Sequence, residues 1–316
     1  MVTQEQVRDQ VREHATEQAQ GPVVVGVDGS EESYRAVDRA VELAAGTGRD
    51  VRVVHAHAHA GFGAAALREE LAVRSDGQGR PPQPQGLLDV AVDYARDRLA
   101  VLDPTPGQVS GVVHVGSAAG ALCAESDGAS LVVIGSRRHV GLTGMLLGSV
   151  AVPLSAHADA PVVVVRGGQG HAPAGDAPVV VGVDGSRTSA RAVRFAMAEA
   201  ARLGCPLVAV MAWEETSLGA PELAAVLPSA AEMHEDAVRT VSRTLAVGTA
   251  EHPDVRVTRV VERGHPADVL LREAAGARLV VVGSRGRGGF AGLLLGSTSQ
   301  TLLHRSPVDV AVVREL

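Results

Sequence analysis

Residues 22–30 read PVVVGVDGS, and residues 178–186 read PVVVGVDGS again without a change. A second stretch also recurs: LVVIGSR at 131–137 returns as LVVVGSR at 279–285. The first pair is offset by 156 residues and the second pair by 148. A period near 150 residues is much longer than the repeat of a solenoid, so the chain is predicted to contain one domain written twice.

Within each copy, short valine-rich runs alternate with stretches of helical periodicity. Runs of this kind are typical of strands buried on both faces. Strands are expected at Val23–Val27, Val51–Ala56, Val109–Val115, Leu131–Ile134 and Val162–Val165, and again at Val179–Val183, Leu207–Ala212, Val255–Glu262, Leu279–Val282 and Val308–Val313. Helices are expected to begin near Ser30, Leu87, Ser117 and Ser149, and near Ser186, Ser229, Pro266 and Ser297. The alternation predicts parallel βαβ units and an α/β fold with doubly wound sheets.

The repeat also predicts the domain boundaries. We expect a helical extension over residues 1–20, one domain over 21–166, a linker over 167–177 and a second domain over 178–316. The linker is rich in Gly, Pro and Ala, as connecting segments usually are. The two offsets differ by eight residues, and the Pro-, Gly- and Gln-rich stretch 74–86 accounts for the extra length of the first copy.

Composition excludes several classes of function. All 29 basic residues are Arg, which excludes a Walker A loop and Schiff-base chemistry because both need Lys. A net charge of −7 and 2% aromatic residues argue against nucleic-acid binding. No apolar run reaches the ~18 residues of a membrane-spanning helix. The polar start and the two isolated cysteines, Cys123 and Cys205, predict a cytoplasmic protein.

An aspartate directly follows the first strand of each copy, Asp28 in the first and Asp184 in the second. In a doubly wound sheet, ligands bind at the carboxyl ends of the strands. A carboxylate at this place accepts hydrogen bonds from ribose hydroxyls or helps to hold a cation. The alternative is that each aspartate only caps the turn that follows, because Asp-Gly is also a turn dipeptide.

A glycine-rich loop follows the fourth strand of the second copy. It contains Gly283 and Gly286, then nine residues, then Gly296 followed by three hydroxyl residues, Ser297 to Ser299. Glycines allow positive φ and close approach of the backbone to a ligand. The helix that begins here offers free amides and a dipole to an anion, and the hydroxyls add donors. The alternative is a tight turn without a ligand.

The pattern G-x2-G-x9-G-[ST], in a copy that begins VVVGVDGS and ends PVDVAVV, resembles the ATP-binding branch of the universal stress proteins. The resemblance covers nearly the whole chain. It implies two five-stranded parallel sheets of strand order 3-2-1-4-5, a Rossmann-like fold related to the adenine nucleotide alpha hydrolases. It also implies that ATP lies across the ends of the first and fourth strands.

On the second copy, the resemblance implies that Asp184 meets the ribose and that the backbone near Val183 and Ala212 meets the adenine. The phosphates would be surrounded by Gly283, Gly286, Gly296, Ser297, Thr298 and Ser299. The counterparts in the first copy are Val27, Asp28, Ala56, Gly135, Gly148 and Ser149. The first copy departs from the pattern, because Arg138, Val140 and Ala151 replace Gly286, Gly288 and Ser299. Arg138 either obstructs the phosphates and weakens binding or adds a charge to them.

Other candidate sites are weaker. His55, His57 and His59 alternate near a strand end, but no carboxylate or cysteine accompanies them, so no metal site is predicted. The two cysteines are interpreted as small buried residues. Arg285 and Arg287 either contact phosphate or lie on a solvated rim. No catalytic residues are assigned.

The sequence therefore predicts a tandem stress-response protein that binds ATP, or a related adenine nucleotide, with Mg²⁺. It would regulate an unidentified protein partner through nucleotide binding, with at most weak ATP hydrolysis. Two alternatives stay open: a slow ATPase or nucleotidyl-transfer enzyme on the same fold, and an interaction module without nucleotide.

The last strand of each copy is apolar and lies at the edge of its predicted sheet. Exposed valine-rich edges pair readily with other strands. We expect Val162–Val165 and Val308–Val313 to pair within one chain and form an intramolecular pseudo-dimer. The alternatives are pairing of the same edges between chains, as a homodimer, and two independent domains on a linker.

Overall fold

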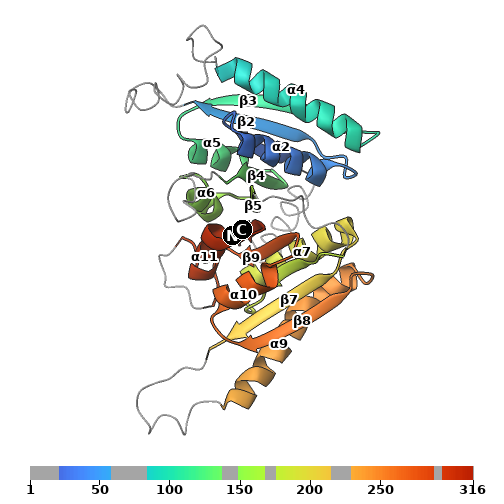
Figure 1. The fold of residues 1–316 in the computed structure, drawn as a ribbon, viewed down its shortest axis with the longest axis vertical. Helices are drawn as coiled ribbons and strands as arrows, with labels where there is room; N and C mark the ends of the chain where they lie inside the picture. The colour runs from blue at the N-terminus through green and yellow to red at the C-terminus, as the bar shows by residue number, and fades with distance from the viewer. Residues whose placement is uncertain are drawn as a thin grey trace, which may run out of the picture. The chain divides into compact units, whose positions relative to one another are not determined.

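The computed structural model describes residues 21–57, 84–136, 149–167, 176–214, 229–287 and 294–315. The extension predicted over residues 1–20 lies outside these ranges. Contacts between Cα atoms divide the described residues into two compact units, of which the first ends at Gly167 and the second begins at Asp176. Figure 1 shows the helices and strands of the two units.

The first unit alternates strands and helices along the chain. Its elements are β1 (Val23–Val27), α2 (Glu31–Ala44), β2 (Val51–His57), α4 (Pro84–Leu102), β3 (Val109–Val115), α5 (Ala118–Glu125), β4 (Leu131–Gly135), α6 (Ala151–His157) and β5 (Val162–Val165). Neighbouring strands are parallel, in the order β3-β2-β1-β4-β5. Helices α2 and α4 pack on one face of this sheet, and α5 and α6 pack on the other.

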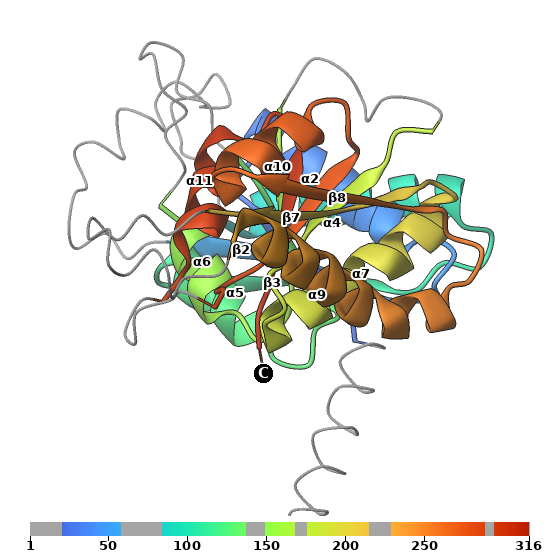
Figure 2. The ribbon, with the colours of Figure 1, turned by 90° about the horizontal axis from the view of Figure 1, so that it is seen from below.

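The second unit repeats this arrangement. Its elements are β6 (Val179–Gly182), α7 (Arg187–Leu203), β7 (Leu207–Trp213), α9 (Ala230–Glu251), β8 (Val257–Arg263), α10 (Pro266–Ala274), β9 (Leu279–Gly283), α11 (Ser297–Arg305) and β10 (Asp309–Val313). Its strands are parallel in the order β8-β7-β6-β9-β10. Figure 2 shows α10 and α11 on one side of β7 and β8, with α7 and α9 on the other. Both sheets therefore have the predicted 3-2-1-4-5 order.

The valine runs form the core of each unit as their pattern predicts. Val23, Val24 and Val25 of β1 are fully buried, and the valines of β6 at 179–181 are buried in the same way. The edge strands β3 and β8 differ from the expectation of burial on both faces, because their residues are exposed or half-buried. An edge strand has a neighbour on one side only, and its outer residues contact solvent.

The first helix of each unit begins at a serine cap. The hydroxyl of Ser30 accepts a hydrogen bond from the Ser33 amide at 3.2 Å, and Ser186 accepts one from the Ser189 amide at 3.1 Å. Such caps satisfy an amide that has no partner within the helix. They fix the turn between the first strand and the first helix, where the predicted aspartates lie.

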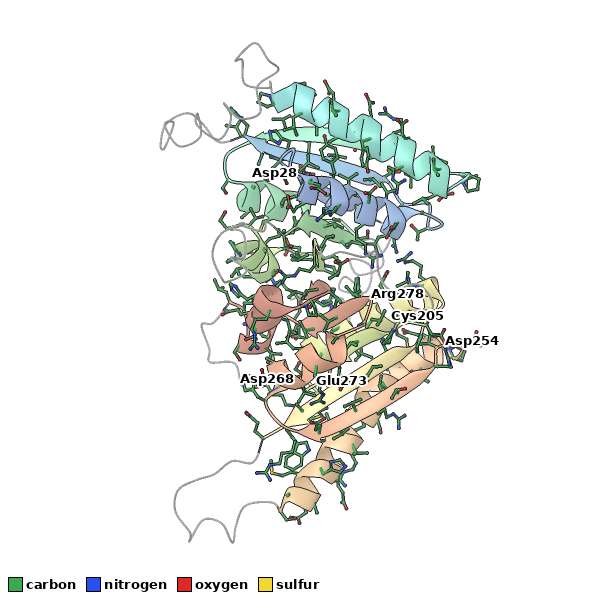
Figure 3. All side chains as sticks on the ribbon, viewed as in Figure 1. Asp28, Cys205, Asp254, Asp268, Glu273 and Arg278 are labelled. Carbon is green, nitrogen blue, oxygen red and sulfur yellow. The ribbon has the colours of Figure 1, made fainter. Side chains whose placement is uncertain are left out.

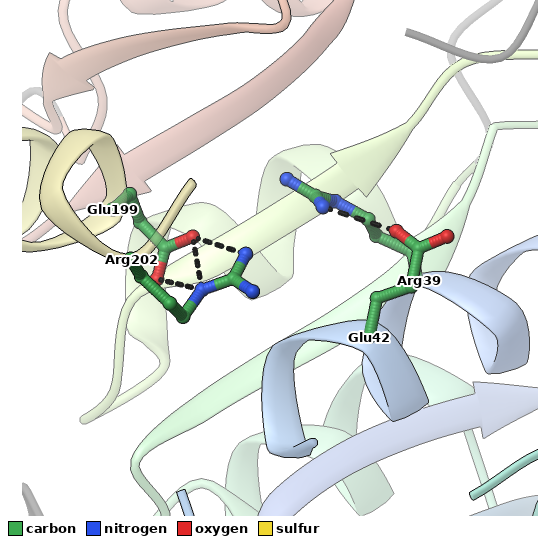
Figure 4. A network of polar contacts seen from close by, with 4 residues as sticks. All are labelled: Arg39, Glu42, Glu199 and Arg202. Carbon is green, nitrogen blue, oxygen red and sulfur yellow. Dashed lines mark hydrogen bonds and ion pairs between the residues drawn. The ribbon is translucent and has the colours of Figure 1, made fainter. Parts of the chain in front are cut away.

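Ion pairs near the ends of α2 and α7 join residues three apart on one helix. Arg39 pairs with Glu42 at 3.2 Å and Arg202 pairs with Glu199 at 2.9 Å (Figure 4). Pairs at this spacing stabilise a helix by about 0.2–0.5 kcal/mol. None of the four residues lines the pocket described below.

Among the described helices, none is long and apolar enough to cross a membrane.

One prediction concerns Asp103, which follows α4 and is 5% exposed. Its carboxylate accepts hydrogen bonds from the Thr105 amide at 2.9 Å and the Gly46 amide at 2.7 Å, and these bonds lower the pKa of Asp103 below its ordinary value of 3.8. A carboxyl with a lowered pKa stabilises the folded state above its ordinary pKa, and this contribution disappears as the pH falls through the lowered value. We therefore expect Asp103→Asn to lower the melting temperature at pH 7.

The difference between wild type and Asp103→Asn should shrink in acid, below pH 3.8, where the unfolded carboxyl is protonated. Calorimetric melting curves from pH 7 to pH 3 measure it. Asp97→Asn on the exposed side of α4 is the control. Equal loss of stability at every pH would show that the amide contacts of Asp103 do not depend on its charge.

Candidate functional site

A pocket of about 470 Å³ opens in the second unit at the carboxyl ends of β6, β7 and β9. The strand order of this sheet reverses between β6 and β9, so the pocket lies at the topological switch point. The nine residues that the sequence singles out in the second copy all line it: Val183, Asp184, Ala212, Gly283, Gly286, Gly296, Ser297, Thr298 and Ser299. The fold thus brings together segments that are up to 116 residues apart.

Asp184 lies at the end of β6, on the wall of the pocket. Its Oδ1 accepts a hydrogen bond from the Ser186 amide at 2.8 Å, which is the turn-capping role. Its Oδ2 accepts one from the Arg287 amide at 2.9 Å, so the carboxylate also holds the start of the glycine-rich loop. A carboxylate has about four acceptor sites, and both oxygens retain capacity for ligand hydroxyls. Capping and ligand binding are therefore compatible at this residue.

Two of the three loop glycines, Gly283 and Gly286, pack closely against their neighbours. Glycines are expected here partly because glycine allows positive φ. Positive φ is not the reason, since none of Gly283, Gly286 and Gly296 has it. A Cβ atom on Gly286 would collide with Oδ2 of Asp184, and one on Gly283 would lie 2.9 Å from Cγ2 of Thr188. A Cβ on Gly296 would be in ordinary contact, at 3.4 Å from the Ser284 carbonyl oxygen. Of the three positions, an added Cβ would thus make its shortest contact at Gly286, with the carboxylate of Asp184.

The N-terminus of α11 faces the pocket. Its cap residue, Gly296, has extended backbone angles, and no side chain caps the helix. The first intrahelical bond runs from the Gln300 amide to the Gly296 carbonyl at 3.0 Å. The amides of Ser297, Thr298 and Ser299 precede this bond and have no acceptor within the helix. Three amides and the positive end of the helix dipole form a suitable place for an anion.

Much of the remaining wall is apolar, and sequence reasoning missed most of this apolar part. Val210, Val282, Leu270, Leu295 and Pro266 line the pocket beside Val183 and Ala212. Val210 precedes Ala212 by two residues on the same strand, so strand alternation alone would have placed both on one face. Leu270 and Pro266 lie on α10, and only the packing of α10 on β6 and β7 brings them here. An apolar wall of this kind suits the face of a purine base.

Ser189 is a further lining residue that the sequence analysis did not identify. It is 3% exposed, and its hydroxyl oxygen accepts hydrogen bonds from the amides of Gly185 at 3.2 Å and Asp184 at 3.4 Å. A signal was present, because both copies carry serine three residues after the helix cap, Ser33 and Ser189. Ser189 thus holds the turn that carries Asp184.

Two arginines stand at the mouth of the pocket. Arg285 and Arg287 are exposed, and their guanidinium groups have no ion-pair partner within the described ranges. The Arg287 guanidinium lies against Gly185, since a Cβ built on that glycine would collide with it. Asp184 is the one carboxylate among the lining residues, so the mouth carries an excess of positive charge. This favours an anionic ligand.

The first unit keeps part of the same arrangement. Asp28, which is labelled in Figure 3, follows β1, and its Oδ1 accepts a hydrogen bond from the Ser30 amide at 3.0 Å. Gly135 ends β4 and packs closely, because a Cβ there would collide with the Glu32 carbonyl. Val27 and Ala56 lie at the carboxyl ends of β1 and β2. Gly148, Arg138 and Val140 lie outside the described residues.

The helix of the first unit that was expected to begin near Ser149 begins later. Ser149 and Val150 form a turn, and α6 starts at Ala151, which corresponds to Ser299 and not to Ser297. Helix α6 has seven residues, whereas α11 has nine. The amide of Ser149 is therefore not in the first turn of a helix, and the anion-binding arrangement of α11 is not repeated.

Two of the weaker candidates, His55 and Cys205, are buried. Nδ1 of His55 contacts the Val27 carbonyl oxygen at 3.0 Å, His57 is exposed, and His59 is outside the described residues. Within the described part of the chain, no three His, Cys, Asp or Glu side chains are grouped so that they could hold a metal ion. Cys205 is 5% exposed, and this burial raises the pKa of its thiol. Figure 3 shows Cys205 beside Arg278, whose positive charge opposes this effect and lowers the pKa. Cys123 is half-buried.

Comparison with known proteins gives one family. The model of the universal stress protein family matches residues 21–166 and 177–314. A universal stress protein of Mycobacterium tuberculosis is 34% identical over 305 residues, which cover 92% of this chain and 94% of that protein. A universal stress protein from Mycolicibacterium smegmatis is 41% identical over 198 residues. The match covers 63% of this chain and 66% of that protein, so it spans slightly less than two thirds of that protein's length.

A solved structure shows the same fold. The crystal structure of a universal stress protein from Archaeoglobus fulgidus matches with a TM-score of 0.62 and 21% sequence identity. The match covers 94% of this chain and 99% of that chain. The tandem arrangement and the Rossmann-like α/β architecture are therefore shared with that protein.

Proposed function

We propose that this chain, which belongs to the universal stress protein family, binds ATP in the pocket of its second unit and acts through that binding. The observation that carries the proposal is the convergence of three features on one pocket. These are the carboxylate of Asp184, an apolar wall and the unpaired amides of α11. They match the three chemical parts of an adenine nucleotide: ribose hydroxyls, base and phosphates.

In the proposed complex the ribose hydroxyls donate to Asp184, which retains free acceptor sites. The adenine lies against Val183, Ala212 and Leu270, where lining atoms are mostly apolar. The phosphates accept from the amides of α11 and from the hydroxyls of Ser297 and Thr298. Arg285 and Arg287 add positive charge at the mouth, which replaces the Lys of other phosphate loops.

The direct test is to identify the ligand that the purified protein retains. Nucleotide released by heat and identified by mass spectrometry is expected to be ATP or a related adenine nucleotide, at about one per chain. Titration calorimetry on nucleotide-free protein then measures affinity. If the protein retains no nucleotide and shows no heat of binding, the interaction module becomes the better interpretation. Steady turnover of ATP that disappears in pocket variants would favour the ATPase.

A second prediction concerns Mg²⁺. The pocket supplies one carboxylate, and an ATP bound there carries more charge than two arginines neutralise. Mg²⁺ prefers phosphate oxygens and water over all-protein sites, so it would enter with the nucleotide. We expect EDTA to weaken the binding of ATP measured by calorimetry and to leave the binding of adenosine unchanged. Equal affinity for ATP with and without EDTA would remove Mg²⁺ from the complex.

Two further points stay predictions from the sequence. The first unit is proposed to bind nucleotide more weakly, because Arg138 and Ala151 replace Gly286 and Ser299.

Pairing of the last strands of the two copies into a pseudo-dimer is proposed from their apolar sequences. Val310→Pro is expected to loosen the units from each other without unfolding either; small-angle scattering measures this. An already extended wild type would contradict it.

A further inference from the structure

The carbonyl of Ser284, directly after β9, holds the start of α11 at two points. The Gly296 amide donates to it at 2.7 Å, and the Ser299 hydroxyl donates to it at 3.1 Å. Ser284 is itself anchored to the sheet, because its amide donates to the Val313 carbonyl of β10 at 2.7 Å. Ser284 and Ser299 are each 2% exposed. The first turn of the helix is therefore attached to the end of a buried strand.

The hydroxyl of Ser299 is committed to the protein. Its Oγ lies 3.1 Å from the Ser284 carbonyl oxygen and 2.9 Å from the Gly296 carbonyl oxygen. A hydroxyl has one hydrogen, and both of these neighbours are acceptors. The hydrogen is therefore shared between these two carbonyl oxygens, of which that of Gly296 is the nearer. The sequence predicts that all three hydroxyls from 297 to 299 donate to the ligand, and the contacts of Ser299 give its hydroxyl a second role within the protein.

The first unit shows the same anchor without the hydroxyl. The Ser136 amide donates to the Val165 carbonyl at 2.9 Å, which reproduces the bond from Ser284 to Val313. The residue at the position of Ser299 is Ala151, which cannot donate. In this unit the helix begins two residues later, and its cap residue, Val150, has helical rather than extended backbone angles. A second difference acts at the same place, because Pro153 replaces Thr301 and has no amide hydrogen for a bond to the Ser149 carbonyl.

We propose that Ser299 is a positioning residue that decides whether a unit presents a phosphate site. By bonding the first turn of α11 to Ser284, its hydroxyl keeps Ser297 and Thr298 helical and their amides directed at the pocket. Ala151 removes this bond in the first unit, independently of Arg138. The inference rests on the proposed function for its ligand, and it extends that function by assigning one part of the difference between the copies to the hydroxyl of Ser299.

The attachment is tested first without any ligand, on the full chain. Ser299→Ala should speed hydrogen exchange of the Gly296 amide by about five- to tenfold, the effect of losing one buried hydrogen bond. Ser299→Thr retains the hydroxyl and should restore most of the protection. Ser242→Ala is the matched control, because it removes a hydroxyl that donates to the Val238 carbonyl at 2.9 Å on α9, away from the pocket. Unchanged exchange in Ser299→Ala would overturn the inference.

The consequence for binding is tested with ligands that differ only in phosphate. Ser299→Ala should weaken ATP about tenfold and AMP less, and it should leave adenosine unchanged, because the hydroxyl acts on the phosphate amides alone. Trp213 is the one Trp of the chain and directly follows Ala212, so its fluorescence reports on the second unit. An equal loss for ATP and adenosine would overturn the inference, since it would mean general damage to the pocket.

The two tests separate this inference from the proposed function. If wild-type protein binds neither ATP nor AMP, the proposed function fails. Hydrogen exchange in Ser299→Ala still decides whether the hydroxyl holds the helix start. If wild type binds ATP and Ser299→Ala binds it with the same affinity, the proposed function stands and the positioning role is wrong.

Discussion

Replacing Gly286 by arginine is expected to reduce the affinity of the second unit for ATP by about 100-fold or more, at ~1.4 kcal/mol for each factor of ten. A Cβ atom at this position collides with Oδ2 of Asp184, the oxygen that also accepts the Arg287 amide. Any side chain therefore displaces either the carboxylate or the loop. The substitution also reproduces Arg138, the residue that the first copy carries here.

Two variants identify the cause of the loss. Gly286→Ala adds only the Cβ atom, and we expect it to produce most of the effect, because the clash begins at that atom. Gly296→Ala is the matched control within the loop, since its Cβ would be in ordinary contact at 3.4 Å. Calorimetry measures all three. If Gly286→Arg leaves total ATP binding untouched, the pocket of the second unit is not the main site.

Replacing Asp184 by asparagine is expected to weaken ATP by about 30- to 100-fold, because a charged acceptor is lost from both the ribose and the Arg287 amide. An asparagine side chain has one acceptor oxygen, so it must turn its NH₂ group toward either Ser186 or Arg287, and both of those are donors. The variant therefore removes one bond from the turn or one from the loop.

The ribose contribution is measured with a nucleotide that lacks its hydroxyls. Wild type should bind ATP more tightly than 2′,3′-dideoxy-ATP, and Asp184→Asn should lose most of this preference. Asp28→Asn makes the same change in the first unit, where Oδ1 accepts from Ser30 at 3.0 Å, and it should have a smaller effect on total binding. Retention of the full preference by Asp184→Asn would mean that Asp184 acts on the loop and not on the ribose.

Most of the fold was predictable because its signals are local. The valine runs, the serine caps and the exact repeat of PVVVGVDGS place the strands and the first helices within a few residues. Burial of a valine run on both faces needs helices on both sides, and the alternation along the chain supplies them. The helix expected near Ser149 begins at Ala151, and Pro153 contributes to this, because proline has no amide hydrogen to donate to the Ser149 carbonyl.

The sequence by itself determined which residue types meet at the candidate site: a strand-tip aspartate, spaced glycines and a helix start with hydroxyls. Tertiary structure decided what each of them does. Gly286 is required by the carboxylate of Asp184, 102 positions earlier, and Ser299 is held by the carbonyl of Ser284. Leu270 reaches the pocket only because α10 packs on β6 and β7. Periodicity and spacing are properties of neighbouring residues, whereas steric fit and hydrogen-bond partners depend on which distant segments the packed sheet brings into contact.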